Sequence, residues 1–148
     1  MPSSDDNPVT FRGIPAALRP PACGRFARHL RERVARGRDF HCLITTDAEL
    51  RRLNRDFLGL DYPPDVLSFP AGNRDRLGDL AISLPRARAQ ARRFGHSVRQ
   101  EIRILMLHGL LHLMGMDHER DGGRMARAEK RWRGKLGLPH GLIERVSP

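Results

Sequence analysis

The sequence contains no long uninterrupted apolar run, and this absence excludes a membrane-spanning apolar helix. Its longest apolar segment is broken near its start by Arg99, Glu101 and Arg103, so it falls short of the ~18 residues of a membrane-spanning helix. The first residues, MPSSDDNPVTFRG, have neither the basic start nor the apolar core of a secretion signal. We therefore expect a cytoplasmic protein without a membrane partner.

Cysteine and aromatic residues are also scarce. The two cysteines, Cys23 and Cys42, lack CxxC spacing, so in a reducing compartment we expect two free thiols rather than a disulfide or a metal site. With one tryptophan and one tyrosine, the chain has few side chains on which unpaired bases can stack. If the protein binds RNA, it should recognise backbone and shape before base identity.

Basic residues, by contrast, are abundant. The net charge is +10 and the pI is near 11.3, values that are most often found in nucleic-acid-binding domains. Of the 27 basic residues only Lys130 and Lys135 are lysines, a skew that a GC-rich genome would also produce without selection for RNA binding. Arginine nevertheless offers planar, bidentate pairing to phosphate.

The length of 148 residues predicts a single domain, residues 1–148. Hydrophobic periodicity and turn residues predict strands at 9–11, 40–45, 66–69 and 78–84, and helices over 22–36, from Thr46 or Asp47, over 85–93, from Ser97, and over 123–136. The strands at 66–69 and 78–84 should pair as a hairpin. In the second helix Leu50, Leu53 and Phe57 should face inward.

The segment HGLLHLMGMDH, from His108 to His118, carries the strongest functional signal. His108 and His112 are four residues apart in an apolar helix, so they project from one face and can reach one metal ion. Gly115 is placed to end the helix in a left-handed conformation and to return His118 toward the pair. Three neutral imidazoles leave one tetrahedral position for water, as in catalytic zinc sites.

The identity of the ion is less determined than the ligand set. One zinc ion is favoured, although imidazoles also bind nickel, copper or iron, and no organic cofactor is expected. Each histidine taken alone could be an ordinary surface or core residue. The spacing of the three together is what favours a metal site. His41 in the 40–45 strand is better explained as a packed or exposed residue than as a ligand.

Two residues inside the motif limit the chemistry. In HExxH peptidases the residue after the first histidine is a glutamate base, whereas here it is Gly109, which disfavours peptide hydrolysis. Gly109 is either required because a side chain would collide with packing or substrate, or simply tolerated in the helix. Asp117 either accepts a hydrogen bond from a ligand histidine and orients it, or caps the turn before the last helix.

The segments LNRDF and DVLSFP (53–70), GDLAIS (78–83) and HGLLHLMGMDH (108–118) together resemble the YbeY family of bacterial zinc-dependent endoribonucleases. The resemblance implies an α+β fold with a mixed four-stranded sheet flanked by helices, and a central buried helix carrying zinc on His108, His112 and His118. It further implies single-strand-specific cleavage of ribosomal RNA in late 16S rRNA 3′-end maturation on the small ribosomal subunit, and 70S ribosome quality control.

One departure from the family pattern concerns catalysis. Where the family has RxKD, with an arginine that takes part in RNA cleavage, this sequence has Leu58, Leu60 and Asp61. The catalytic side chain therefore stays unassigned, and the zinc ion would supply the chemistry by activating its bound water or as a Lewis acid on a phosphate oxygen. Arg55, one helical turn earlier, is either a substitute for this arginine or an ordinary exposed residue of the helix. The alternative functions are a non-catalytic, zinc-stabilised ribosome assembly factor and a zinc hydrolase of peptides.

Overall fold

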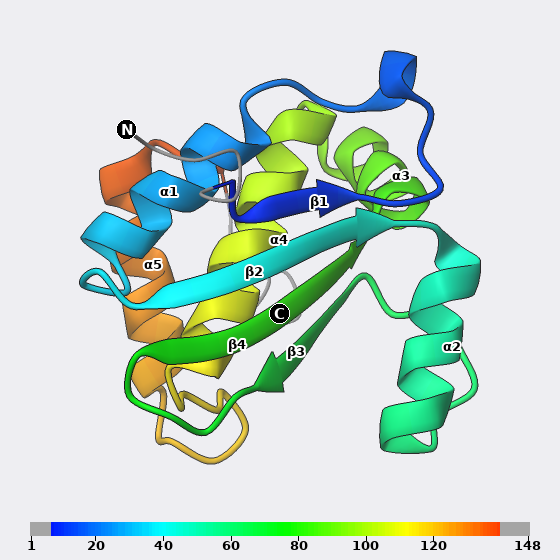
Figure 1. Ribbon diagram of the computed structural model, residues 1–148. Coiled ribbons are helices and arrows are strands. Elements are labelled where there is room, and N and C mark those ends of the chain that lie inside the picture. Colours follow the sequence, from blue (N-terminus) through cyan, green and yellow to red (C-terminus); the bar gives the residue numbers. More distant parts are fainter. Residues whose placement is uncertain (1–6, 140–148) are drawn as a thin grey trace.

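The computed structural model describes residues 7–139, and its four strands form one mixed sheet in the order β1-β2-β4-β3 (Figure 1). The strands are β1 (Val9–Phe11), β2 (Asp39–Thr45), β3 (Val66–Pro70) and β4 (Arg76–Ser83). The β1–β2 and β2–β4 pairs are parallel, and β3–β4 is antiparallel. The predicted α+β class and the predicted hairpin are confirmed.

The helices follow the predicted order. They are α1 (Cys23–Arg33), α2 (Asp47–Leu58), α3 (Leu84–Phe94), α4 (Val98–Leu113) and α5 (Arg124–Leu136), with a short 3-10 helix, η2 (Ala16–Leu18). Ser97 and Gln100 form a capping box at the start of α4, which satisfies two backbone donors that the helix leaves open. Within the described residues, every helix is too short or too polar to cross a lipid bilayer.

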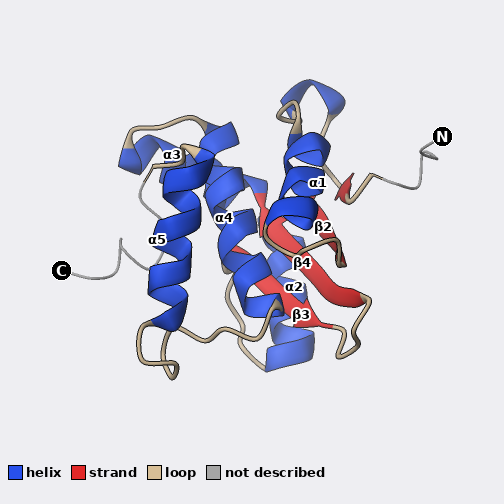
Figure 2. Ribbon diagram, turned by 90° about the vertical axis from the view of Figure 1, so that its left-hand side faces the viewer, coloured by secondary structure: helices blue, strands red, loops and turns tan. Residues whose placement is uncertain are grey.

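Helix α4 lies at the centre of the main core. Figure 2 shows it between α5 and the sheet, and α1 and α3 cover the same face. Most of its residues are buried, including Ile102, Leu105 and Leu110, as is expected of a helix that is apolar around its whole circumference. The predicted central buried helix is therefore confirmed.

Helix α2 packs on the other face of the sheet, where a smaller cluster contains Leu50, Leu67 and Ala81 with partly buried Leu53 and Phe69. The predicted inward direction holds for Leu50 and partly for Leu53, but it is wrong for Phe57, which is 66% exposed. Phe57 lies in the last turn of α2, beside the edge strand β3, so the sheet leaves most of its side chain uncovered. The Phe57 ring instead meets the Phe69 ring edge-on at 5.4 Å between centroids.

Several predicted boundaries shift by a few residues, and two of these shifts have a local cause. Helix α1 ends at Arg33, not at Arg36, because Val34 and Ala35 turn into the core and are buried. Strand β4 ends one residue early because Ser83 is the N-cap of α3, where its side chain accepts a hydrogen bond from the Arg86 N–H.

The two cysteines are free, as predicted, and both are buried. Burial raises the pKa of the Cys42 thiol far above its ordinary value, and the nearby Cys23 raises it further. Both thiols therefore stay protonated and serve as core residues.

Candidate metal centre

The three predicted histidines meet at the C-terminal end of α4. His108 and His112 project from the helix and His118 from the loop after it, and one ligand nitrogen from each lies within 4.8 Å of the others. His108 is buried, His112 is half-buried and His118 is exposed. The group can therefore hold one metal ion with a side open to solvent.

The end of α4 returns the chain toward this group. Gly115 has φ +92°, a left-handed conformation that disfavours residues with a Cβ. Its N–H donates to the His112 carbonyl at 2.9 Å, and the Met116 N–H donates to the Leu111 carbonyl at 3.1 Å. The predicted helix stop at Gly115 is thus confirmed, and it leads the chain back to His118.

The same turn orients His112. The His112 Nδ1 lies 3.0 Å from the Met116 carbonyl oxygen, which can only accept, so Nδ1 carries the proton and Nε2 is left free for a metal. Burial lowers the pKa of His112, and the neighbouring His108 lowers it further. Both effects favour the neutral imidazole, which is the form that binds metal.

His108 is oriented by a residue that the sequence analysis missed. Its Nδ1 lies 2.7 Å from Oε2 of Glu129 on α5, and Glu129 is 1% exposed. A carboxylate behind a ligand histidine fixes the ring and increases its basicity. Helical spacing carries a signal for this residue, because Glu129 lies on the same stripe as Met125, Ala128 and Trp132.

Asp117 shows one of its two expected roles. Its Oδ1 accepts a hydrogen bond from the Glu119 N–H at 3.0 Å, so Asp117 caps the turn. Asp121 Oδ2 in turn accepts hydrogen bonds from the Asp117 N–H and from the Met125 N–H at the start of α5. The loop is therefore tied to α5, while a role of Asp117 toward a histidine remains a prediction.

Gly109 is explained by packing. A Cβ at this position would lie 2.7 Å from Leu80 Cδ2 and 3.3 Å from Ser68 Oγ. The Ser68 hydroxyl donates to the Gly109 carbonyl at 3.1 Å. Of the two alternatives, the requirement for a small residue holds, because α4 approaches β3 and β4 so closely here.

An open hollow gives access to the centre. Its lining includes His112, His118, Ser68 and Glu119. Leu58 and Leu60 do not line it; they are 57% and 45% exposed at and after the end of α2. Arg55, the proposed substitute, pairs with Asp56 at 3.4 Å, as an exposed helix arginine does.

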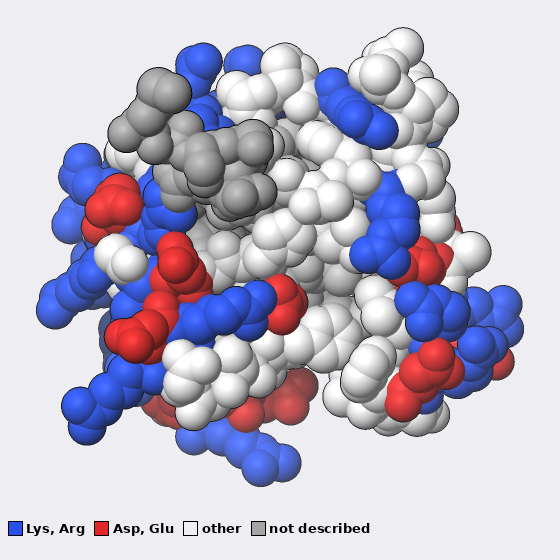
Figure 3. All heavy atoms as spheres, in the orientation of Figure 1, with Lys and Arg blue, Asp and Glu red and all other residues white. Residues whose placement is uncertain are grey.

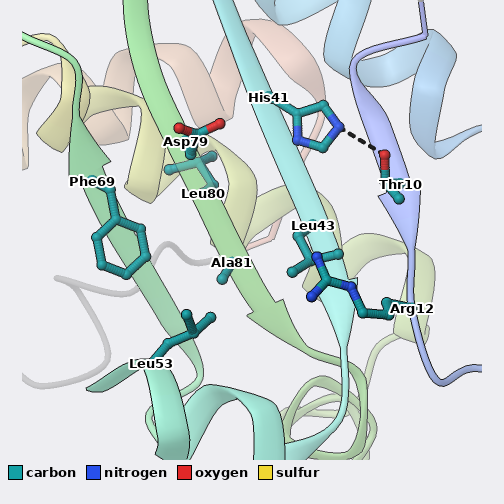
Figure 4. A pocket seen from close by; sticks show the side chains of 9 residues that line it. All are labelled: Thr10, Arg12, His41, Leu43, Leu53, Phe69, Asp79, Leu80 and Ala81. Atoms are coloured by element: carbon teal, nitrogen blue, oxygen red, sulfur yellow. Dashed lines mark hydrogen bonds between the residues drawn. The ribbon is translucent and has the colours of Figure 1, made fainter. Parts of the chain in front are cut away.

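A second hollow lies on the opposite face of the sheet (Figure 4). It is lined by Thr10, Arg12, His41, Leu43, Leu53, Phe69, Asp79, Leu80 and Ala81. His41 Nε2 lies 2.8 Å from Thr10 Oγ1, and burial lowers the pKa of His41. Within residues 7–139, the three side chains placed to hold a metal ion are those at the C-terminal end of α4 and on the loop after it, and His41 is not among them.

Both the sequence and the fold of this chain match known proteins. The family model described as Endoribonuclease YbeY matches residues 25–137. The chain is 68% identical to Endoribonuclease YbeY of Solibacter usitatus, covering 99% of both chains, and 52% identical to that of Koribacter versatilis, covering 71% of this chain and 69% of the relative. A solution structure from Thermotoga maritima has a TM-score of 0.56 at 26% identity, covering 87% of this chain and 91% of the other.

Proposed function

This chain belongs to the YbeY endoribonuclease family, and we propose that it is a zinc-dependent endoribonuclease that cleaves single-stranded regions of ribosomal RNA. The observation that carries the proposal is the convergence of His108, His112 and His118 on one point in a chain whose relatives are named endoribonucleases. The substrate would be the 3′ end of immature 16S rRNA on the small ribosomal subunit. A part in 70S ribosome quality control would follow from the same activity in the cytoplasm.

The residues around the centre fit a bound zinc ion. Nδ1 of His112 faces a carbonyl and Nδ1 of His108 faces a carboxylate, so both rings leave Nε2 for the ion. When bound, zinc supplies Lewis-acid chemistry at a phosphate oxygen and activates water. Glu129 is buried against His108, so it holds the ligand in place and cannot reach a substrate.

The chain offers no base in the peptidase position. Gly109 follows His108 where HExxH enzymes carry glutamate, and it is packed against Leu80. This argues against peptide hydrolysis. The net charge of +10 favours a polyanionic substrate instead.

A second candidate function follows from Leu58. The side chain stands, 57% exposed, where the family pattern has an arginine, so a guanidinium that would stabilise phosphate charge is missing. In that alternative the protein is a ribosome assembly factor in which zinc ties the loop and α5 to α4. Such a protein would bind the small subunit without cutting its RNA.

Cleavage of immature small subunits separates the two functions. Purified protein with zinc restored is compared with His112→Ala and Leu58→Arg variants. Cutting by wild type but not by His112→Ala supports the enzyme, and faster cutting by Leu58→Arg shows that the missing arginine limits the rate. Cutting by Leu58→Arg alone supports the assembly factor.

Substrate presentation can be tested in the same assay. With so few aromatic residues, specificity should depend on the folded subunit more than on base stacking. We expect faster cleavage of the subunit than of the same RNA free in solution. Equal rates on both would contradict a role for the subunit in specificity.

A further inference from the structure

Arginine side chains gather at the end of α4 that is opposite the metal centre. Residues 84–100 contain five arginines and no acidic residue. We call Arg19, Arg88, Arg92 and Arg99 the distal arginine surface. Arg88 and Val98 line two adjoining hollows, one shared with Arg92 and the other with Arg19 and Arg99. Figure 1 shows η2, α3 and the start of α4 at one end of the molecule and the loop after α4 at the other.

The charge of this surface is not compensated by neighbouring acids. No carboxylate of residues 7–139 lies within the 4.0 Å ion-pair distance of these four arginines. Arg86 on α3 pairs with Asp47 instead. Glu101, in the first turn of α4, is fully buried and bonded to His96 at 2.6 Å, so it does not reach the surface.

Around α2, by contrast, arginines are paired with acids. Arg51 binds Asp61 at 2.8 Å, and both Arg12 and Arg52 bind Glu49, at 2.8 and 3.1 Å. Figure 3, in the orientation of Figure 1, shows the side of the molecule that carries α2. Positive and negative side chains are mixed there around a largely uncharged centre. Positive charge is therefore locally neutralised around α2, whereas at the distal arginine surface, where α3 and α4 meet, it is not.

Like charges also act on one another within the first turns of α4, next to the distal arginine surface. Partial burial lowers the pKa of Arg103, and Arg99 lowers it further. The N-terminus of α4 adds its own partial positive charge. Holding uncompensated like charges together costs free energy in the isolated protein, and a bound polyanion removes that cost.

We propose that the distal arginine surface binds the phosphate backbone of the RNA substrate at a distance from the metal centre. This inference rests on the proposed function, because it takes RNA as the substrate. Helix α4 has 16 residues and is therefore about 24 Å long. A stacked strand with ~3.4 Å per nucleotide needs about seven nucleotides to reach from one site to the other.

The binding test compares two triple variants with the same loss of charge. One is Arg88→Gln/Arg92→Gln/Arg99→Gln, and the control is Arg12→Gln/Arg51→Gln/Arg52→Gln, whose arginines are paired. RNA affinity is measured by fluorescence anisotropy on a 20-nucleotide single strand over a range of salt. At ~0.1 M salt we expect at least a tenfold loss for the distal variant, with the salt slope reduced by about 2, since each phosphate contact on a single strand contributes ~0.7.

Equal losses in the two triple variants would overturn the proposal. Because Arg88 is half-buried, the double variant Arg92→Gln/Arg99→Gln, which changes only exposed positions, is measured as well. It should retain the wild-type melting temperature. Its salt slope should still be reduced, by about two thirds of the reduction expected for the distal triple variant. An unchanged slope in this folded protein would also overturn the proposal.

Further measurements distinguish a failure of this proposal from a failure of the proposed function. His112→Ala should bind RNA within about threefold of wild type, and a loss as large as that of the distal variant would overturn a separate binding surface. If no cleavage is found, the nuclease proposal fails, while a slope reduced only by the distal variants still supports the surface. Binding of phosphatidylglycerol vesicles that depends on these arginines, with unchanged RNA affinity, would assign the surface to a membrane and overturn the RNA proposal.

If cleavage is found, its length dependence adds a test. The distal variant should cleave a four-nucleotide RNA like wild type, because so short a strand cannot reach both sites. On a 20-nucleotide RNA its KM should rise about tenfold while kcat stays within twofold. Equal effects on both lengths would contradict a distant anchor.

Discussion

Two buried histidine–glutamate pairs stand at opposite ends of α4 and have different surroundings. At the N-terminal end His96 Nε2 lies 2.6 Å from Glu101 Oε1, and at the C-terminal end His108 Nδ1 lies 2.7 Å from Glu129 Oε2. Each histidine side chain is no more than 10% exposed. The pairs are thus alike in chemistry and burial.

The difference lies in which nitrogen is used and what faces the other one. Glu129 takes Nδ1 of His108 and leaves Nε2 toward His112 and His118. Glu101 takes Nε2 of His96, which lies among Ser97, Val98 and arginines. The comparison teaches that a carboxylate behind a histidine prepares a metal ligand only where further ligands converge, and otherwise ties a helix junction together.

Removing the N-terminal pair should have the largest effect on stability. Glu101→Ala leaves a buried imidazole without its partner, so the free energy of unfolding should fall by about 3 kcal/mol. Urea denaturation measures this. The metal affinity of the folded variant should stay within twofold of wild type, and a loss comparable to that of a Glu129 variant would break the distinction between the two pairs.

Removing the C-terminal pair should mainly affect the metal. Glu129→Gln keeps the volume but weakens the acceptor that holds His108, so zinc affinity should fall by about 10- to 100-fold. Competition with a chromophoric chelator measures the affinity. Lys130→Gln, the exposed neighbour, is the matched control and should change it less than twofold. A Glu129→Gln protein with wild-type affinity would show that this carboxylate does not position the ligand.

The sequence predicted the convergence of the three histidines because their signals are local. The spacing of His108 and His112 follows from the helix repeat, and Gly115 marks the turn that returns His118. Glu129 was missed because it is 21 residues away from His108 along the chain. Asp117 was predicted as a candidate histidine partner because it is adjacent to His118 in the sequence. Distance along the chain is a poor guide to a partner on another helix.

The fold shows the same division between local and distant causes. The starts of α2, α3 and α4 have a local cause. The N-cap side chains of Thr46, Ser83 and Ser97 each accept a backbone hydrogen bond from the first turn of the helix that follows. The exposure of Phe57 depends instead on its place beside β3, the strand at the edge of the sheet. Hydrophobic periodicity predicts which face is apolar, but it does not indicate where the partner surface ends.

Gly109 lies on the helix that connects the two pairs and tests how tightly that helix is held. Gly109→Ala places a methyl group 2.7 Å from Leu80 Cδ2. The packing cost of ~2 kcal/mol exceeds the ~1 kcal/mol gained in helix propensity, so unfolding free energy should fall by about 1 kcal/mol. Gly134→Ala on α5, which meets nothing within 4 Å, should raise it instead. Equal signs in the two variants would contradict the close approach of α4.

A third histidine, without a carboxylate bonded to its ring, should show the smallest effect. His41 bonds the Thr10 hydroxyl, and burial lowers its pKa although Asp79 opposes the shift. The unfolded chain therefore binds more protons than the fold at this position, so the stability linked to His41 is present above pH ~6.5 and is lost as the pH falls through the lowered pKa. Urea titrations from pH 7.5 to 5 should show a shallower decline for His41→Gln than for wild type. A decline as steep in the variant would assign the pH dependence to other groups.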